Sequence, residues 1–210
     1  VAVLRHNGIP VKLIRQNQCC GMPKLELGDL DSVDAYKQRN MPPMSDAVND
    51  GWDIIAPIPS CVLMFKQELP LMYPDDAQVL AIKRAIFDPF EYLMHRQTAG
   101  LLKNDFRNEL GKVAWQAACH QRVQNIGPKT KQVLELVPGT QVTAIERCSG
   151  HDGTYGVKKA TYDNARKIAK PVESRVKQSE AQHFSSDCVM AGAHIAHGLN
   201  DGTAAQHPLR

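Results

Sequence analysis

Short apolar runs alternate with helical patterns along most of the chain. Five runs have the length and composition of β-strands, and each is followed by a cysteine: Val11–Ile14, Trp52–Ile58, Val113–Ala118, Gln141–Ile145 and Ala181–Ser185. Stretches with helical periodicity lie between these runs, at Asp29–Asn49, Pro128–Val137 and Val157–Gln178. The opening residues, Val1–Asn7, have the pattern of the last turns of a further helix. This alternation predicts an α/β protein in which helices cover mainly parallel sheets.

The order of these elements also predicts where the cysteines lie. The loops that follow the strand ends of a parallel sheet form a common crevice. Each predicted strand is followed by one such cysteine: Cys19 (with Cys20 beside it), Cys61, Cys119, Cys148 and Cys188. We therefore expect cysteines that are distant in sequence to converge on loops at the carboxyl ends of the strands.

The cysteine motifs occur twice. Cys19-Cys20-Gly21 is followed by Pro59-Ser60-Cys61, and Cys148-Ser149-Gly150 is followed by Ser186-Asp187-Cys188. The offset is 129 residues from Cys19 to Cys148 and 127 from Cys61 to Cys188. This agreement predicts two pseudo-repeated modules, at residues 1–110 and 111–210, with a small helical insert between about Leu63 and Gly111.

The first module is expected to be incomplete at its N-terminus. Cys119 of the second module has no counterpart in the first, because the equivalent position falls before Val1. The repeat therefore predicts that the coding sequence upstream of Val1 contains a further cysteine about ten residues away.

The composition favours reduced cysteines in a cytoplasmic protein. A chain of 210 residues with 43% hydrophobic content can build a core without the three disulfides that six cysteines would allow. The formal net charge of +3 is too small to indicate a nucleic acid partner. No apolar stretch approaches the roughly 20 residues that a membrane-spanning helix needs. The thiols are therefore expected to serve metal binding or redox chemistry.

Convergent thiolates select zinc, copper(I) or iron–sulfur clusters. Structural zinc sites usually separate paired cysteines by two to four residues, whereas Cys19 and Cys20 are adjacent and suit two metal atoms of one cluster better. Gly21 and Gly150 follow the cysteine motifs and would let the backbone pass close to a cluster. For any single cysteine, a small buried hydrophobic side chain remains the alternative interpretation.

Histidines near the second set of cysteines are candidate additional ligands. His151 lies three residues after Cys148 in a glycine-rich loop, and His120 lies beside Cys119. A hydrogen-bonding role in the loop remains open for His151. His194 and His197 are expected at the surface or behind the ligands, on the helix after Cys188.

Five stretches together resemble a known family: Cys19-Cys20-Gly21-Met22-Pro23, Pro59-Ser60-Cys61, Ala118-Cys119-His120, Cys148-Ser149-Gly150 and Asp187-Cys188. In order and over nearly the whole chain, they are similar to the cysteine-rich CCG-domain proteins, which include subunits of heterodisulfide reductase and of anaerobic glycerol-3-phosphate dehydrogenase. The resemblance implies an iron–sulfur-binding, electron-transfer component of a larger oxidoreductase. It also implies redox partners, a flavoprotein or a ferredoxin-like subunit, and attachment to a membrane only through such partners.

The chain departs from the family pattern of a lone Cys, Cys-Cys-Gly and Cys-x-x-Cys. Met64 and Ala191 stand where the second cysteine of each Cys-x-x-Cys would be, and Ser149 replaces the second cysteine of the second Cys-Cys-Gly. Each module therefore offers three thiolates here.

We expect two metal sites. The ligands of one would be Cys19, Cys20 and Cys61, and those of the other Cys119, Cys148 and Cys188 with His151. An iron–sulfur cluster is the expected cofactor, and zinc at one site is an alternative. Two other functions remain open: a zinc- or iron-stabilised interaction subunit without redox turnover, and a thiol enzyme that acts on disulfide or persulfide substrates.

Overall fold

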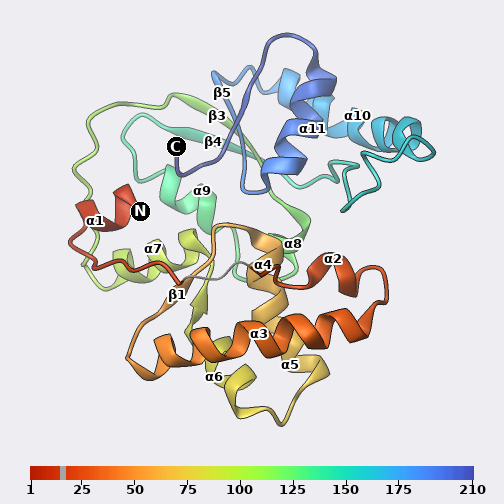
Figure 1. Ribbon diagram of the computed structural model, residues 1–210. Helices are drawn as coiled ribbons and strands as arrows, with labels where there is room; N and C mark the ends of the chain where they lie inside the picture. The colour runs from red at the N-terminus through yellow and green to blue at the C-terminus, as the bar shows by residue number, and fades with distance from the viewer. Residues whose placement is uncertain (15–17) are drawn as a thin grey trace. The chain divides into compact units, whose positions relative to one another are not determined.

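The computed structural model describes residues 1–14 and 18–210, which form two compact units, Val1–Tyr92 and Leu93–Arg210 (Figure 1). Both units combine helices with short parallel strands, which confirms the predicted α/β class. The division falls at Tyr92, earlier than the expected module boundary at residue 110, and the proposed duplication stays a prediction. No helix in the described ranges is long and apolar enough to cross a membrane.

The first unit is mainly helical. Its helices and strands are α1 (Ala2–His6), α2 (Met22–Leu25), α3 (Leu30–Asn49), β1 (Ile54–Ile55), α4 (Pro59–Leu63), the π-helical segment η1 (Met64–Glu68), α5 (Leu69–Met72), α6 (Ala77–Ala85) and β2 (Ile86–Phe87), and α7 (Pro89–Thr98) runs across the division. Strands β1 and β2 pair in parallel, with Ile54 opposite Ile86. One apolar cluster forms the core and draws on α3, β1, η1, α6 and β2.

Helix α3 begins where the sequence predicts. The Asp29 carboxylate accepts hydrogen bonds from the Ser32 backbone N–H (3.2 Å) and the Ser32 hydroxyl (2.8 Å), which caps the free N–H groups of the first turn. Lys24 adds an ion pair to the same carboxylate at 2.9 Å. The helix then continues to Asn49, through Pro42 and Pro43.

The predicted strand at Val11–Ile14 is wrong. These residues have no helix or strand, and Leu13 is 79% exposed. Only Ile14 of this run packs against the core, so the run lacks the burial that stabilises a strand. The strand expected at Trp52–Ile58 is limited to Ile54–Ile55, because the prolines that follow it have no N–H to donate to a strand ladder.

The expected insert between Leu63 and Gly111 does contain helices, but its first part belongs to the core of the first unit. It supplies strand β2, and its side chains Met64, Leu69 and Ile82 are fully buried. Loss of these side chains would leave cavities in the core of the first unit, so this segment is not a peripheral insert.

The second unit contains a parallel sheet with helices on both faces. Its elements are β3 (Lys112–Gln116), α8 (Cys119–Arg122), α9 (Lys129–Leu134), β4 (Gln141–Ile145), α10 (Tyr162–Gln178), β5 (His183–Ser186), α11 (Val189–Leu199) and β6 (Ala205–Gln206). The strand order is β4-β3-β5-β6, and every pair is parallel. Ala114 of β3 packs with α10 and α11 on one face, whereas Val113 and Trp115 pack with α9 on the other.

The sequence placed most elements of this unit correctly. Strand β4 has the predicted bounds, and β3 and β5 differ from them by one or two residues at each end. Helices α9 and α10 are shorter than expected because Glu135–Gly139 and Val157–Thr161 form turns and bends. These differences leave the order of strands and cysteines unchanged.

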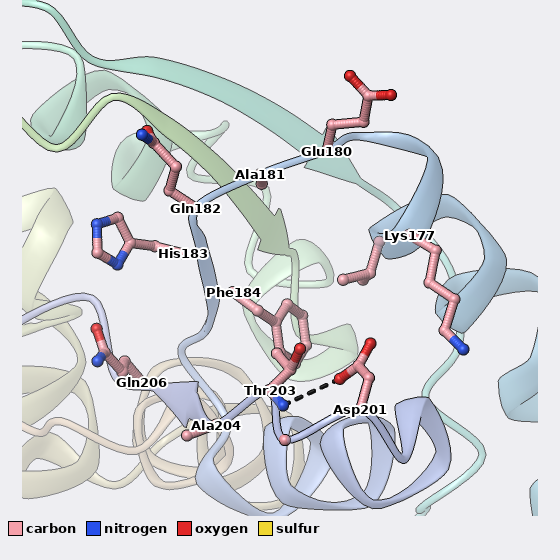
Figure 2. Close-up of a pocket in the computed structure, with 12 residues that line it drawn as sticks. Lys177, Glu180, Ala181, Gln182, His183, Phe184, Asp201, Thr203, Ala204 and Gln206 are labelled. Carbon is pink, nitrogen blue, oxygen red and sulfur yellow. Dashed lines mark hydrogen bonds between the residues drawn. The ribbon is translucent and has the colours of Figure 1, made fainter.

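A pocket of about 460 Å³ lies at the amino end of β5, where His183, Phe184, Lys177 and Asp201 line it (Figure 2). Asp201 accepts a hydrogen bond from the Thr203 backbone N–H at 2.9 Å. None of the residues lining this pocket is a cysteine, and Cys188 lies beyond the opposite end of β5. The pocket is therefore separate from the cysteine loops of the second unit, where the metal site is predicted.

Gly150 permits close packing of the loop after β4 against α10. It has a left-handed φ of 75°, and a Cβ at this position would collide with the backbone carbonyl oxygen of Ala165. Gly127 of the same unit has a similar φ of 77° but has open space around its Cα. An alanine at Gly127 would therefore carry only the cost of the left-handed backbone, whereas an alanine at Gly150 would carry that cost and the cost of the collision.

We predict that Gly127→Ala lowers the free energy of unfolding by about 1 kcal/mol, the cost of a left-handed alanine. Gly150→Ala carries the same cost and must also displace α10, so its loss should reach about 2–4 kcal/mol. Urea unfolding followed by far-ultraviolet circular dichroism measures both. Equal losses in the two variants would contradict the packing of Gly150 against Ala165.

Candidate metal centre at the strand ends

In the second unit, three cysteines follow the carboxyl ends of three adjacent strands, as the sequence predicts. Cys119 follows β3 and begins α8, Cys148 lies in the loop after β4, and Cys188 is the N-cap of α11 after β5. Cys119 and Cys148 are exposed and Cys188 is half-buried. The central position of β3 in the sheet brings the Cys119 loop next to the other two.

Cys119 and Cys148 interact directly. Partial burial raises the pKa of the Cys119 thiol, and the nearby Cys148 raises it further through charge repulsion and a side-chain hydrogen bond, whereas Arg122 opposes the shift. The Cys148 sulfur also accepts the Gly150 backbone N–H at 3.3 Å. Two thiol side chains in direct contact are well suited to bind one cation, because a cation would offset the repulsion between their thiolates.

The structure does not assemble a complete ligand set. Within residues 1–14 and 18–210, no three His, Cys, Asp or Glu side chains are grouped so that they could hold a metal ion. Cys188 contacts its neighbours through its backbone N–H, which donates to the Ser186 hydroxyl at 3.3 Å. The assignment of three thiolates to each site therefore stays a prediction.

His151 is 8% exposed and lies in the loop after Cys148. Its backbone N–H donates to the Ser149 hydroxyl at 3.3 Å, and its ring centroid lies 6.1 Å from that of His194. Burial lowers the pKa of His151, so its imidazole is neutral over a wider pH range. The neutral imidazole is the form that coordinates metals.

The other histidines take different positions. His194, on the buried face of α11, lies beside His151, so it is behind the candidate ligands rather than at the surface. His197 is exposed. His120 is half-buried on α8, next to Cys119.

In the first unit, Cys20 and Cys61 form a thiol pair. Cys20 is 8% exposed, and Cys61 is half-buried in α4. The hydrogen bond between the two side chains raises the pKa of Cys20, with burial as the next cause, and lowers the pKa of Cys61. When the pair loses one proton, Cys61 therefore loses it, and Cys20 keeps its own and donates it to the Cys61 sulfur.

Cys19 is exposed beside this pair. Its sulfur accepts the Gly21 backbone N–H at 3.5 Å, and its carbonyl oxygen accepts a hydrogen bond from the fully buried Asn40 side chain at 3.0 Å. Sequence reasoning missed Asn40, although a polar residue on the buried side of α3 is a signal that could have indicated it. Asn40 holds the Cys19-Cys20 loop against the core.

The two cysteine–glycine loops have the same local geometry. Gly21 and Gly150 both have positive φ, of 98° and 75°, and each donates its N–H to the cysteine sulfur two residues earlier. An N–H directed at a sulfur stabilises the thiolate. The cysteine sulfurs are soft metal ligands, and backbone N–H groups donate hydrogen bonds to them. Both features fit an iron–sulfur group.

A pocket of about 320 Å³ adjoins the thiol pair of the first unit. Cys20 and Cys61 contribute to its wall, which is otherwise mainly apolar, and the aromatic rings of Trp52 and Phe65 lie on it. Lys12 lies over the Trp52 ring, with its ammonium nitrogen 4.9 Å from the ring centroid. The pair is therefore accessible to a small, largely apolar molecule.

Asp187, directly before Cys188, is the most buried carboxyl group near the candidate site, at 1% exposed. It accepts hydrogen bonds from Trp115 Nε1 (2.6 Å) and from the Thr130 hydroxyl (2.8 Å). Burial raises its pKa in spite of these donors. Asp187 ties the start of the Cys188 loop to β3 and α9, a role that its place in the cysteine motif did not reveal.

Comparisons with known proteins agree with these features. Residues 1–66 match the family model of the cysteine-rich CCG domain. The chain is 25% identical over 213 residues to a subunit of the anaerobic glycerol-3-phosphate dehydrogenase of Escherichia coli K12, a match that covers 100% of the chain and 52% of the relative. It is 24% identical over 202 residues to a subunit of the fumarate reductase (CoM/CoB) of Methanothermobacter marburgensis, covering 94% of the chain and 37% of that relative.

A third relative is lactate utilization protein A of Bacillus cytotoxicus, which is 25% identical over 193 residues, covering 90% of the chain and 78% of the relative. The chain spans about half the length of its relative from the dehydrogenase and less of its relative from the fumarate reductase. These matches confirm the resemblance indicated by the cysteine motifs, and the family model places the cysteine-rich CCG domain at residues 1–66.

Proposed function

We propose that this chain is an iron–sulfur-binding, electron-transfer subunit or domain of a larger oxidoreductase. The observation that carries the proposal is the placement of Cys119, Cys148 and Cys188 after three adjacent parallel strands. The names of its relatives, subunits of a glycerol-3-phosphate dehydrogenase and of a fumarate reductase, support it at the level of the family.

Two sets of residues would hold the metal. Cys19, Cys20 and Cys61 would serve one site, and Cys119, Cys148 and Cys188 with His151 the other. An iron–sulfur group supplies one-electron transfer when it is bound. The residues of this chain would set the potential, because the Gly21 and Gly150 N–H groups stabilise negative charge on the Cys19 and Cys148 sulfurs.

The partners follow from this role. An electron-transfer component needs a donor and an acceptor, and a flavoprotein or ferredoxin-like subunit would supply one of them. A cytoplasmic location, with any membrane attachment through partner subunits, completes the proposal. Zinc in place of iron at one site remains the alternative cofactor.

The thiol pair of the first unit favours a second candidate function, reduction of a small disulfide. The Cys61 thiolate would attack a substrate disulfide that occupies the adjoining pocket, forming a mixed disulfide and releasing one substrate thiolate. Cys20 would then displace the second substrate thiol and leave a Cys20–Cys61 disulfide. Two electrons and two protons from a redox partner would restore the two thiols.

We predict that the full chain, purified and reconstituted without oxygen, retains iron and acid-labile sulfide. Thiolate-to-iron charge transfer should give it visible absorption that dithionite bleaches. Quantification of iron, sulfide and zinc per chain provides the measurement. Zinc without sulfide, and a colourless protein, would favour the structural alternative.

The second unit is expected to retain metal more firmly than the first. It has three thiolates and His151 within one unit, whereas the first unit offers three thiolates and the thioether of Met64, a weak ligand. Cys148→Ala should therefore release most of the bound metal, and Cys61→Ala little of it. Metal analysis after gel filtration tests this, and equal losses in the two variants would show that the firmer site is assigned to the wrong unit.

The thiol pair predicts a pH dependence in the metal-free chain. Because Cys20 lowers the pKa of Cys61, alkylation of Cys61 should rise at a lower pH than that of an ordinary thiol with its pKa of 9.0. Cys20→Ala should move this rise to higher pH. Cys19→Ala should move it to lower pH, because Cys19 raises the pKa of Cys61 by charge repulsion.

Iodoacetamide labelling across a pH series, with the Cys61 peptide quantified by mass spectrometry, measures these shifts. Movement in the same direction in both variants would contradict the shared proton.

A further inference from the structure

We propose that Gln116 is the positioning residue that holds the three cysteine loops of the second unit in register. The inference rests on the proposed metal site and names a residue that makes the site possible. Gln116 is the last residue of β3, the strand that pairs with both β4 and β5, and is 1% exposed.

The Gln116 side chain contacts all three loops. Its amide nitrogen donates to the carbonyl oxygens of Ala117 (3.0 Å) and Arg147 (3.1 Å), and its amide oxygen accepts the Ser186 hydroxyl (2.8 Å). The Ser186 oxygen in turn accepts the backbone N–H of Cys188 at 3.3 Å.

Each contact lies one or two residues before a cysteine. Ala117 precedes Cys119 by two residues, Arg147 precedes Cys148 by one, and Ser186 precedes Cys188 by two. The partners Arg147 and Ser186 are 31 and 70 residues away in sequence. One carboxamide therefore joins loops that no local interaction would keep together.

The position of these contacts distinguishes Gln116 from an ordinary buried polar residue. The strand pairing ends at its level, with Gln116 opposite Ile145 of β4 and Ser186 of β5. Beyond this point each strand continues into its own loop and helix. The Gln116 side chain adds hydrogen bonds between the strands just past the last paired residues. An apolar side chain could fill the same volume without the desolvation cost of an amide, but it could not join the loops.

Gln124 provides a matched control. It is 5% exposed in the same unit, and its amide nitrogen donates at 3.0 Å to the carbonyl oxygen of His120, four residues earlier. Replacing either glutamine with methionine keeps the length of the side chain and removes its amide. A general cost of losing a buried amide should affect both variants, whereas a loss of loop register should affect Gln116→Met.

The test uses the full, reduced, metal-free chain with Cys19→Ser, Cys20→Ser and Cys61→Ser, so that the second unit gives the signal. The first readout needs no metal: a short bifunctional thiol reagent links Cys119 to Cys148, and mass spectrometry follows the linked peptides. Gln116→Met should slow linking by about three- to tenfold, because it removes the hydrogen bond to the Arg147 carbonyl oxygen, and that is the factor that loss of one such bond typically carries. Gln124→Met should leave the rate unchanged.

The second readout is titration of the same chains with Co²⁺, which reports thiolate ligation through its charge-transfer absorption. Gln116→Met should weaken Co²⁺ binding by about 10- to 100-fold, as is typical when a group that orients metal ligands is lost. Ser186→Ala, a milder change, should weaken Co²⁺ binding while the linking of Cys119 to Cys148 stays unchanged, because it removes only the connection to Cys188.

Equal linking rates in the parent and Gln116→Met, or equal slowing in Gln116→Met and Gln124→Met, would overturn the inference. Slower linking in Gln116→Met together with a parent that binds neither Co²⁺ nor iron would support the positioning role and contradict the proposed function. The two failures are therefore distinguishable.

Discussion

The parallel pairing of β3 with both β4 and β5 is the constraint on which the candidate site of the second unit depends. The register places Gln116 opposite Ile145 on one side and opposite Ser186 on the other, so the three strands end at the same level. Apolar side chains on both faces hold the sheet between α9 and the pair α10 and α11. Proximity of the cysteine loops is thus a property of the sheet, and no single motif produces it.

Buried polar groups extend this constraint beyond the strands. At the strand ends, the Gln116 side chain joins the loops that carry the cysteines. Asp187 fixes the start of the Cys188 loop to Trp115 and Thr130. Such groups cost free energy when buried and offset that cost only through well-placed hydrogen bonds. Burial raises the pKa of Asp187, although both donors act in the opposite direction. Each of these loops therefore depends on buried polar contacts that an apolar side chain could not make.

Local patterns predicted the elements whose stability is local or set by simple burial. Helix α3 was predictable because Asp29 caps its first turn, and β4 because Gln141–Ile145 has the length and composition of a strand. Val11–Ile14 has a similar composition but is not a strand, because composition does not reveal whether a partner strand and a core face are available. The cysteines were identified as candidate site residues because their spacing repeats, and their role as ligands stays a prediction. The supporting residues were not, since the partners of Gln116 lie 31 and 70 residues away and nothing near it in sequence indicates them.

A side-chain carboxamide holds a cysteine loop in each unit, although the scaffolds differ. In the first unit, where the sheet has only two short described strands, Asn40 reaches from helix α3 to the carbonyl oxygen of Cys19. In the second, Gln116 reaches from the central strand to the residues before the cysteines. A carboxamide donates and accepts hydrogen bonds without adding charge. A lysine or arginine at either position would lower the pKa of the nearby thiols, and a carboxylate would raise it. Because Asn40 and Gln116 carry no charge, only the cysteines and the group that they bind determine the charge of each site.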